Sequence, residues 1–242
     1  MRRFGKKQGT LLLSAAMVLA SLVFPAKAEA AESTVGLGVT SHTQAEIAAF
    51  ASSHPASLSE SISYSTEPSL GGTYSAGVLS DETVNSAMNL LNQARYIAGV
   101  DSSVTHDATK ANLASAASLL NYLNRNIEHD QKRPDVLSDP SYDQLYDDGK
   151  LGAKSSNLHY SSRYLNLSLN NAIINAWLAD YDAPNIPLVG HRRWLLSPAL
   201  TSVGFGSTVS GSVQYSAVYI SHAYQSSSKD VYVAWPAQEM PV

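Results

Sequence analysis

The order of the periodic segments along the chain constrains its fold more than any other sequence feature. Apolar residues recur at helical intervals of three and four within residues 80–127 and again within 168–180. Two runs rich in β-branched and aromatic residues follow, at Val213–Ile220 and Asp230–Trp235, and the serine-rich segment between them predicts a hairpin. Helices first and strands last predict an α+β domain, with helices packed on a mainly antiparallel sheet.

Capping residues predict where the first two helices begin and end. Ser80 or Asp81 can cap a helix that Gly99 ends, because serine and aspartate accept hydrogen bonds from the first turn and glycine suits the position after the last. Asp107 can cap a second helix, whose apolar stripe predicts that it leads directly to His129. Residues 131–150 are polar and contain two prolines, so we expect mostly loop there.

A third helix is predicted after Ser168, and it carries an unusual acidic residue. Ile173 and Trp177 share its apolar face, and Asp180 follows Trp177 by three residues, which predicts that it lies on the same buried face. A buried carboxylate needs hydrogen-bonding partners. Asp180 is therefore a candidate functional residue.

The chain begins with a pattern typical of a cleavable secretion signal over residues 1–30. Arg2, Arg3, Lys6 and Lys7 precede a 14-residue, mostly apolar stretch at Leu11–Phe24, and small residues at 26–30 offer two cleavage triplets. An uncleaved membrane anchor is the alternative, but the stretch is shorter than the roughly 20 residues that a spanning helix needs. No other segment is apolar enough to span a bilayer, so we expect a secreted, extracellular protein, with the cell envelope as a further destination.

Composition limits the partners of the exported chain. The whole chain has 16 basic and 20 acidic residues, and the predicted signal contains five of the basic residues and one of the acidic residues. The remaining 11 basic and 19 acidic residues give a net charge near −8, which disfavours nucleic acid and anionic membrane surfaces as partners. The sequence has no cysteine, so core burial alone must stabilise the domain.

The predicted organisation has three parts. After the signal, residues 31–79 are rich in small and polar residues and are interpreted as a weakly ordered lead-in, with one short helix at Gln44–Phe50 and a linker at Ser69–Gly77. Residues 80–242 form the predicted domain. Among the seven histidines, His129 and His191 differ from the rest because one ends an apolar helix and the other follows a glycine at the start of an ordered motif.

Several motifs in this domain resemble those of the CAP superfamily, which comprises cysteine-rich secretory proteins, antigen 5 and plant pathogenesis-related 1 proteins. Gly190-His191 and, after twelve residues, Val203-Gly204-Phe205-Gly206 are similar to the family's GHYTQVVW and VGCG motifs. Other family-like segments occur in the expected order within residues 80–235: the opening helix at 90–95, the following loop and helix at 104–117, Ser156-Asn157-Leu158 and Trp177-Leu178-Ala179-Asp180.

The resemblance implies a three-layer α-β-α sandwich whose central cavity holds two histidines and two acidic residues. The histidines fall on His129 and His191 and the second acid on Asp180, while Asn157 lies within the matching motif. Three positions depart from the family pattern: Ser156 replaces the first acid, Arg192 a tyrosine and Ser197 a tryptophan. The resemblance is therefore to a divergent, bacterial branch.

Three interpretations of His129, Asp180 and His191 stay open. They can form a hydrogen-bonded structural cluster, or hold Zn²⁺ with one position open, or catalyse metal-assisted hydrolysis. Because Ser156 stands where the family has an acid, we favour ligand binding without turnover, with a small molecule, lipid, glycan or surface protein as partner. Asp180 is the candidate base for the alternative, a metal-dependent extracellular peptidase. A structural cell-wall or spore-layer protein is a second alternative.

Overall fold

A four-stranded sheet forms the centre of the computed structural model, which describes residues 39–162, 167–182, 185–220, 233 and 235. The strand order is β5-β7-β8-β6, with bounds Thr105–His106 for β5, Ser156–Ser162 for β6, Ser202–Ser210 for β7 and Val213–Tyr219 for β8. Strands β6 and β7 both pair antiparallel with β8, and the short β5 pairs parallel with β7. The predicted α+β class with a mainly antiparallel sheet is confirmed.

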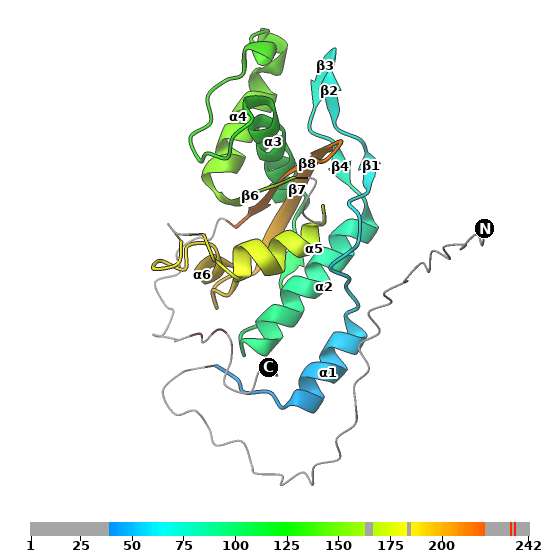
Figure 1. The fold of residues 1–242 in the computed structure, drawn as a ribbon, viewed down its shortest axis with the longest axis vertical. Coiled ribbons are helices and arrows are strands. Elements are labelled where there is room, and N and C mark those ends of the chain that lie inside the picture. Colours follow the sequence, from blue (N-terminus) through cyan, green and yellow to red (C-terminus); the bar gives the residue numbers. More distant parts are fainter. Residues whose placement is uncertain (1–38, 163–166, 183–184, 221–232, 234, 236–242) are drawn as a thin grey trace, which may run out of the picture. The chain divides into compact units, whose positions relative to one another are not determined.

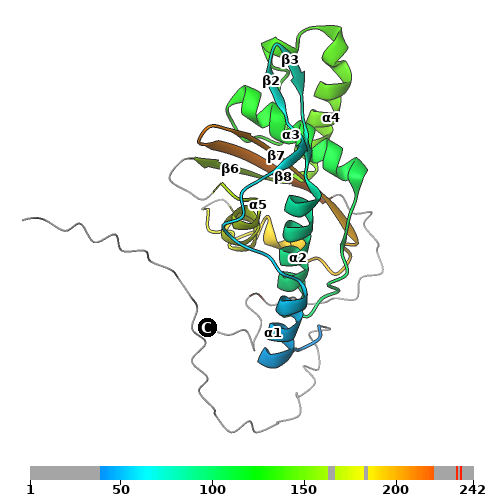
Figure 2. The ribbon, with the colours of Figure 1, turned by 90° about the vertical axis from the view of Figure 1, so that its right-hand side faces the viewer.

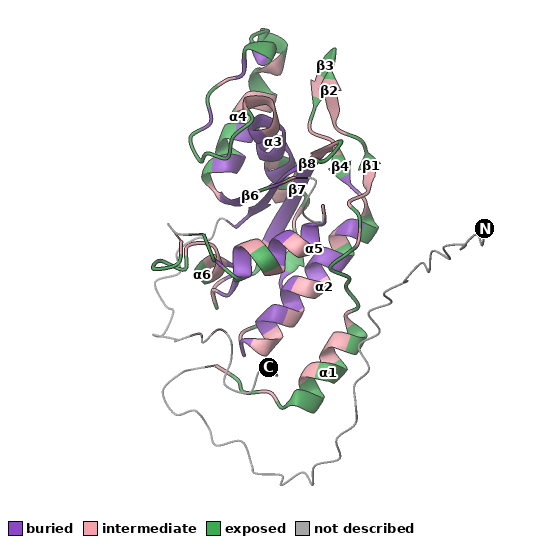
Figure 3. Cartoon of the chain, viewed as in Figure 1, coloured by how far each residue is buried: buried purple, intermediate pink, exposed green. Residues whose placement is uncertain are grey.

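Helices cover both faces of this sheet (Figure 1, Figure 2). Helices α3 (Ala108–Asn124) and α4 (Asp143–Lys154) lie on one face. The other face is covered by α2 (Asp81–Ile97), by α5 (Leu169–Asn171) continuing into the π-helical turn η3 (Ala172–Leu178), and by α6 (Arg192–Leu195). Figure 3 shows that the buried residues concentrate in the sheet and in the helices packed on it. The layers are therefore α-β-α, as the resemblance implied.

The alternation of side chains along β7 explains the glycines of its sequence motif. Val203 and Phe205 belong to the core on the α2 and η3 side of the sheet. Gly204 and Gly206 face α3, because a Cβ added to either would lie 2.1 Å from a backbone nitrogen of that helix. The glycines therefore let α3 pack with its backbone against the strand.

The predicted helix starts are confirmed, and one predicted helix end is wrong. Ser80 and Asp107 cap α2 and α3 through hydrogen bonds from backbone N–H groups three residues on, and Gly99 has the positive φ (73°) expected after α2. Helix α3, however, ends at Asn124 instead of leading to His129. Arg125 adopts the left-handed conformation (φ 54°) that terminates a helix.

Helix α4 begins within residues 131–150, which the sequence predicted as mostly loop, and ends at Lys154. Pro140 begins the short 3₁₀ turn η2 (Pro140–Tyr142) that leads into α4, and another turn, η1 (Asp135–Leu137), precedes it. Gly149 and Gly152 do not break α4, because both are buried where it crosses α3. A Cβ on Gly152 would lie 2.0 Å from the carbonyl oxygen of Leu113. Tertiary packing thus overrides the low helix propensity of glycine here.

The lead-in contains regular structure from residue 44 onward. Helix α1 (Gln44–Ser53) confirms the predicted short helix and begins with a capping box between Thr43 and Glu46. The linker predicted at 69–77 is wrong in its first part, because β2 (Ser69–Gly71) and β3 (Thr73–Ser75) form a hairpin turned at Gly72, φ 78°. Strand β1 (Tyr64–Thr66) pairs with β4 (Val78–Leu79). The domain boundary at residue 80 stays a prediction.

The predicted C-terminal hairpin is wrong in its pairing. Strand β8 is flanked on both sides, by β6 and by β7, so neither edge is open to a third strand. Gly211 supplies the positive φ (58°) of the tight turn between β7 and β8. Most of residues 230–235, like the predicted signal at 1–30, lies outside the described residues. No helix in the described ranges combines the length and apolarity that crossing a membrane requires.

Candidate functional site

A cavity of about 480 Å³ opens at the end of the sheet where β6 begins and β8 ends. It brings together four of the five predicted site residues, His129, Ser156, Asn157 and His191. The other residues that line it are Lys154, Ser155, Asn185, Leu188, Gly190, Arg193, Trp194 and Ile220. The fifth predicted residue, Asp180, is buried behind His191 and does not line the cavity.

Asp180 holds His191 and the start of α6 in place. Its carboxylate accepts hydrogen bonds from His191 Nδ1 at 2.8 Å, from the His191 backbone N–H at 3.1 Å and from the Arg192 backbone N–H at 2.9 Å. The Asp180 side chain is fully buried, whereas that of His191 is 18% exposed. Since a carboxylate accepts, His191 donates from Nδ1, and in the neutral imidazole Nε2 keeps its lone pair.

The end of η3 places Asp180 at this position. Trp177 is fully buried and donates from its indole nitrogen to the carbonyl of Leu158 in β6, which fixes η3 on the sheet. Asp180 itself follows the helical turn with φ 51°. Aspartate tolerates this left-handed conformation better than most residues. The predicted burial of Asp180 is confirmed, although the residue lies beyond the helical turn that carries Trp177.

His129 reaches the cavity from the opposite face of the sheet, through the loop that follows α3. Its Nδ1 lies 2.7 Å from the carbonyl oxygen of Ala153 in α4. A carbonyl only accepts, so His129 also donates from Nδ1 and keeps the Nε2 lone pair in its neutral form. Two imidazoles with the same tautomer therefore line one cavity. Fixing Nδ1–H with a backbone carbonyl or a carboxylate is the usual way to prepare imidazole Nε2 as a metal ligand.

Ser156 and Asn157 lie between the two histidines at the start of β6. Asn157 donates from Nδ2 to the backbone carbonyl of His191 at 3.0 Å, which joins β6 to the segment before α6. The Ser156 hydroxyl oxygen is buried but has no hydrogen-bond partner among the described residues. It therefore offers a polar atom to a ligand at the position where the resemblance implied an acid.

A different group of residues also has the geometry to hold a metal ion. Ligand atoms of Asp180, Asp182 and His191 lie within 4.8 Å of one another. His129 is not part of this group. An ion bound by Asp180, Asp182 and His191 would compete with the hydrogen bonds that the Asp180 carboxylate already accepts. An ion bound by His129 and His191 would leave those hydrogen bonds in place.

The charged side chains that line the cavity are basic. Lys154 and Arg193 line it together with the two histidines, and no carboxylate does so among the described residues. His159 lies two residues after Asn157 on β6. It carries no charge at neutral pH, because burial and, less strongly, His191 lower its pKa to about 4. This lining suits an anionic ligand.

Sequence reasoning missed several residues that line the cavity. Arg193 and Trp194 directly follow His191, so their closeness in sequence was an available signal. Asn185 and Leu188 come from the loop between Asp180 and Gly190, where the sequence has no helical or strand periodicity from which to predict which side chains face the cavity. Close packing explains their placement, because a Cβ on Gly190 would lie 2.0 Å from the Asn185 side-chain oxygen.

Comparison with known proteins identifies the family. The family model described as "CAP: Cysteine-rich secretory protein family" matches residues 45–224. Searches of curated proteins and of solved structures each gave no match. The match covers most of the 242-residue chain, including all five predicted site residues. The chain therefore belongs to the cysteine-rich secretory protein (CAP) family.

Proposed function

We propose that this protein is an exported binding protein that takes an extracellular or cell-surface ligand into the cavity between His129 and His191. The observation that carries the proposal is the matched pair of imidazoles. Each donates from Nδ1 to a fixed acceptor, and each lines the same cavity. Groups held in this way are prepared for a ligand, since little orientation is left to lose on binding.

The charge and shape of the lining indicate an anion with an apolar body. Lys154 and Arg193 supply positive charge, and Leu188, Trp194 and Ile220 supply apolar surface. The Ser156 hydroxyl, which has no hydrogen-bond partner in the described part of the chain, adds a polar group. A pocket with apolar walls and a few fixed polar groups is typical of a small-molecule site.

The donor set also fits Zn²⁺, which His129 and His191 would hold. Bound there, the ion would supply a Lewis acid with positions left for other ligands. The chain itself orients both imidazoles, through Ala153 and Asp180. The Asp180 carboxylate accepts three hydrogen bonds and is fully buried, and Ser156 replaces the other expected acid. Because no carboxylate of the residues that the structure describes lines the cavity, binding is better supported than hydrolysis.

Calorimetric titration with Zn²⁺ alone tests the metal part of the proposal. We expect one zinc per chain, with binding weakened at least tenfold in His129→Ala and in His191→Ala and unchanged in Asp182→Ala. Loss in Asp182→Ala with retention in His129→Ala would instead assign the ion to the Asp180, Asp182 and His191 group. Absence of zinc binding in every protein would leave the cavity without a metal.

Ligand entry can be followed separately through the fluorescence of Trp194. With octanoate as the probe, we expect a saturable change that is lost in Trp194→Phe and weakened at least fivefold in Arg193→Gln. No change in the parent protein would contradict an anion site. A peptide library incubated with Zn²⁺ tests the alternative function, and cleavage that disappears in both histidine variants would establish a hydrolase.

A further inference from the structure

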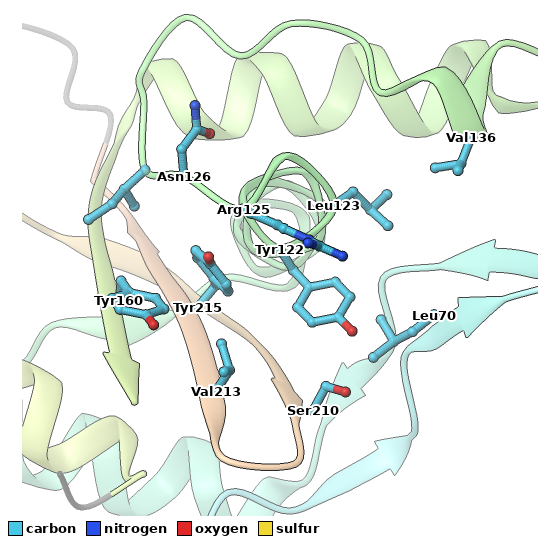
Figure 4. Close-up of a pocket in the computed structure, with 11 residues that line it drawn as sticks. Leu70, Tyr122, Leu123, Arg125, Asn126, Val136, Tyr160, Ser210, Val213 and Tyr215 are labelled. Carbon is cyan, nitrogen blue, oxygen red and sulfur yellow. The ribbon is translucent and has the colours of Figure 1, made fainter. Parts of the chain in front are cut away.

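A second and larger cavity, of about 770 Å³, lies at the opposite end of the sheet, beside the turn between β7 and β8 (Figure 4). Three elements contribute a tyrosine to it: Tyr122 from α3, Tyr160 from β6 and Tyr215 from β8. The rings of Tyr160 and Tyr215 lie 5.0 Å apart, and those of Tyr122 and Tyr215 lie 6.1 Å apart, edge to face. Neither His129 nor His191 lines this cavity, so it is a separate site.

The hydroxyl groups of these tyrosines are available to a ligand. None of the three makes a hydrogen bond with a described residue. Burial raises the pKa of Tyr215 above the ordinary value of 10.0, which already keeps a tyrosine protonated at neutral pH. The cavity therefore presents three phenolic donors beside three aromatic faces.

Arg125 adds a cation at a backbone position that is unfavourable for arginine. It occupies the left-handed position after α3 (φ 54°), where glycine is the usual residue. Its guanidinium has no hydrogen bond or ion pair with a described residue, and no other charged side chain from the described part of the chain lines the cavity. Strained residues often occur at binding sites, where the side chain serves a function that a better-suited residue could not.

The openness of the cavity restricts the kind of ligand that fits. Tyr160, Ile127 and Val136 are 43%, 45% and 49% exposed, so a bound molecule would remain partly in solvent. An acyl chain would gain little at such a rim, whereas the flat C–H faces of sugar rings stack on exposed tyrosines. The tyrosine hydroxyl groups suit an acceptor-rich ligand, and the exposed Arg125 suits a negatively charged one. We infer that this cavity binds an acidic glycan whose sugar rings bear carboxylates.

Oligogalacturonate is a suitable probe, with a neutral glucan oligomer of the same length as the reference ligand. Titration calorimetry of the purified protein should show binding of the acidic oligomer that is at least tenfold tighter than that of the neutral one and weakens as ionic strength rises. Arg125→Gln should lose at least tenfold in affinity. Lys132→Gln removes the same charge from an exposed position outside this cavity and should change affinity less than twofold.

Two further variants separate binding from folding. Arg125→Gly should unfold at a temperature no lower than the parent, because glycine suits the left-handed position, yet it should lose binding as Arg125→Gln does. Tyr160→Phe should bind more tightly than Tyr160→Ala, because it keeps the stacking face. The double variant His129→Ala/His191→Ala should bind the oligomer as the parent does, which distinguishes this site from the proposed function.

Several outcomes would overturn the inference. Equal affinity for acidic and neutral oligomers, or unchanged affinity in Arg125→Gln, would remove the role of Arg125. Failure of the parent protein to bind either oligomer would remove the glycan. Arg125-dependent binding to phosphatidylglycerol vesicles without binding to oligogalacturonate would assign the cavity to a lipid surface instead.

Discussion

Asp180 does not line the cavity and affects it only through its contacts with His191. Its carboxylate accepts a hydrogen bond from the imidazole and two from backbone N–H groups, and its side chain is fully buried. A group in this position controls both the tautomer of His191 and the start of α6. It is therefore a positioning residue, and its replacement should affect stability and ligand affinity together.

Asp180→Asn should lower the free energy of unfolding by about 2–3 kcal/mol and weaken zinc binding at least tenfold. Asparagine also tolerates the positive φ of this position, so the backbone is retained, but its amide NH₂ cannot accept from the donors that surround it. Urea denaturation and zinc titration measure the two effects. Asp182→Asn is the matched control, because Asp182 is exposed and its carboxylate accepts a hydrogen bond from the Asn185 side chain. Parent-like stability in Asp180→Asn would contradict the assigned role.

His159 should make the protein less stable in mild acid. Burial, and secondarily His191, lower its pKa in the folded protein to about 4 from an ordinary 6.5. Between these values the unfolded chain binds more protons than the folded one, so stability is full above pH 6.5 and falls as the pH drops toward 4. The loss is on the order of 2–3 kcal/mol.

His159→Phe should remove most of this dependence while keeping an aromatic ring beside Trp177, which His159 meets edge to face. Unfolding free energies measured from pH 4 to 7 give the slopes for both proteins. A smaller slope should remain in the variant, because burial also lowers the pKa of His106. If stability depended on pH equally in the parent and in His159→Phe, His159 would be protonated to the same degree in the folded and unfolded chains.

At the scale of elements, α4 depends on two glycines that bring it close to α3. Gly152→Ala should lower the free energy of unfolding by about 1–3 kcal/mol, although alanine favours helices by about 1 kcal/mol, because its Cβ would clash with the carbonyl oxygen of Leu113. Asp147→Ala, on the exposed side of α4, should change stability by less than about 0.5 kcal/mol. Chemical denaturation of the two variants makes the comparison. A stabilised Gly152→Ala protein would show that α3 and α4 pack less closely.

Helix α1 is held on α2 by a stack of four rings. His42 and Phe50 lie 3.7 and 4.1 Å from Tyr96 on α2, and Phe50 lies 3.9 Å from His54. Tyr96→Ala should therefore release α1, which contains no buried residue of its own. We expect faster amide exchange over residues 43–54, with residues 108–124 unchanged. Tyr96→Phe keeps the ring and should exchange as the parent does, and unchanged exchange in Tyr96→Ala would mean that other contacts hold α1.

The sequence predicted the elements whose signals are local and missed those that depend on tertiary contacts. The caps Ser80 and Asp107 are visible in the sequence because their hydrogen bonds close within three residues. Helix α4 was missed because its segment is polar and two prolines precede it, whereas its glycines pack closely against α3. The same holds at the cavity. Its histidines belong to recognisable motifs, but Lys154 and Asn185 reach it only through the packing of α4 and a loop.

At the scale of the whole molecule, the sheet separates two cavities with different chemistry. The cavity of His129 and His191 lies where β6 begins, and the tyrosine-lined cavity lies beside the turn between β7 and β8. The segment 125–129 joins them, since Arg125 lines one and His129 the other. This loop has no regular structure, so each cavity can be altered by substitution without changing the strands between them.

Arg95 connects α2 to residues 195–200, which begin at the last residue of α6. It is fully buried in α2 and donates to the backbone carbonyls of Asp101, Leu195, Ser197 and Leu200, the nearest of them at 2.6 Å. Asn92, one turn earlier, forms a pair of hydrogen bonds with the backbone of Val104. These contacts give a physical reason for an asparagine and an arginine three residues apart in this family-like helix. They also fix α6, and therefore His191, from a segment about 100 residues away in sequence.

Arg95→Met should lower the free energy of unfolding by about 3–5 kcal/mol, because it fills the space but leaves several buried carbonyls without a donor. That loss is a large fraction of the stability of a typical domain. Lys132→Met removes the same charge from an exposed site and should cost less than about 0.5 kcal/mol. Urea denaturation gives both values, and amide exchange shows where protection is lost. We expect exchange to rise together in α2 and in residues 195–200. A rise confined to α2 would mean that Arg95 stabilises its own helix and does not join it to residues 195–200.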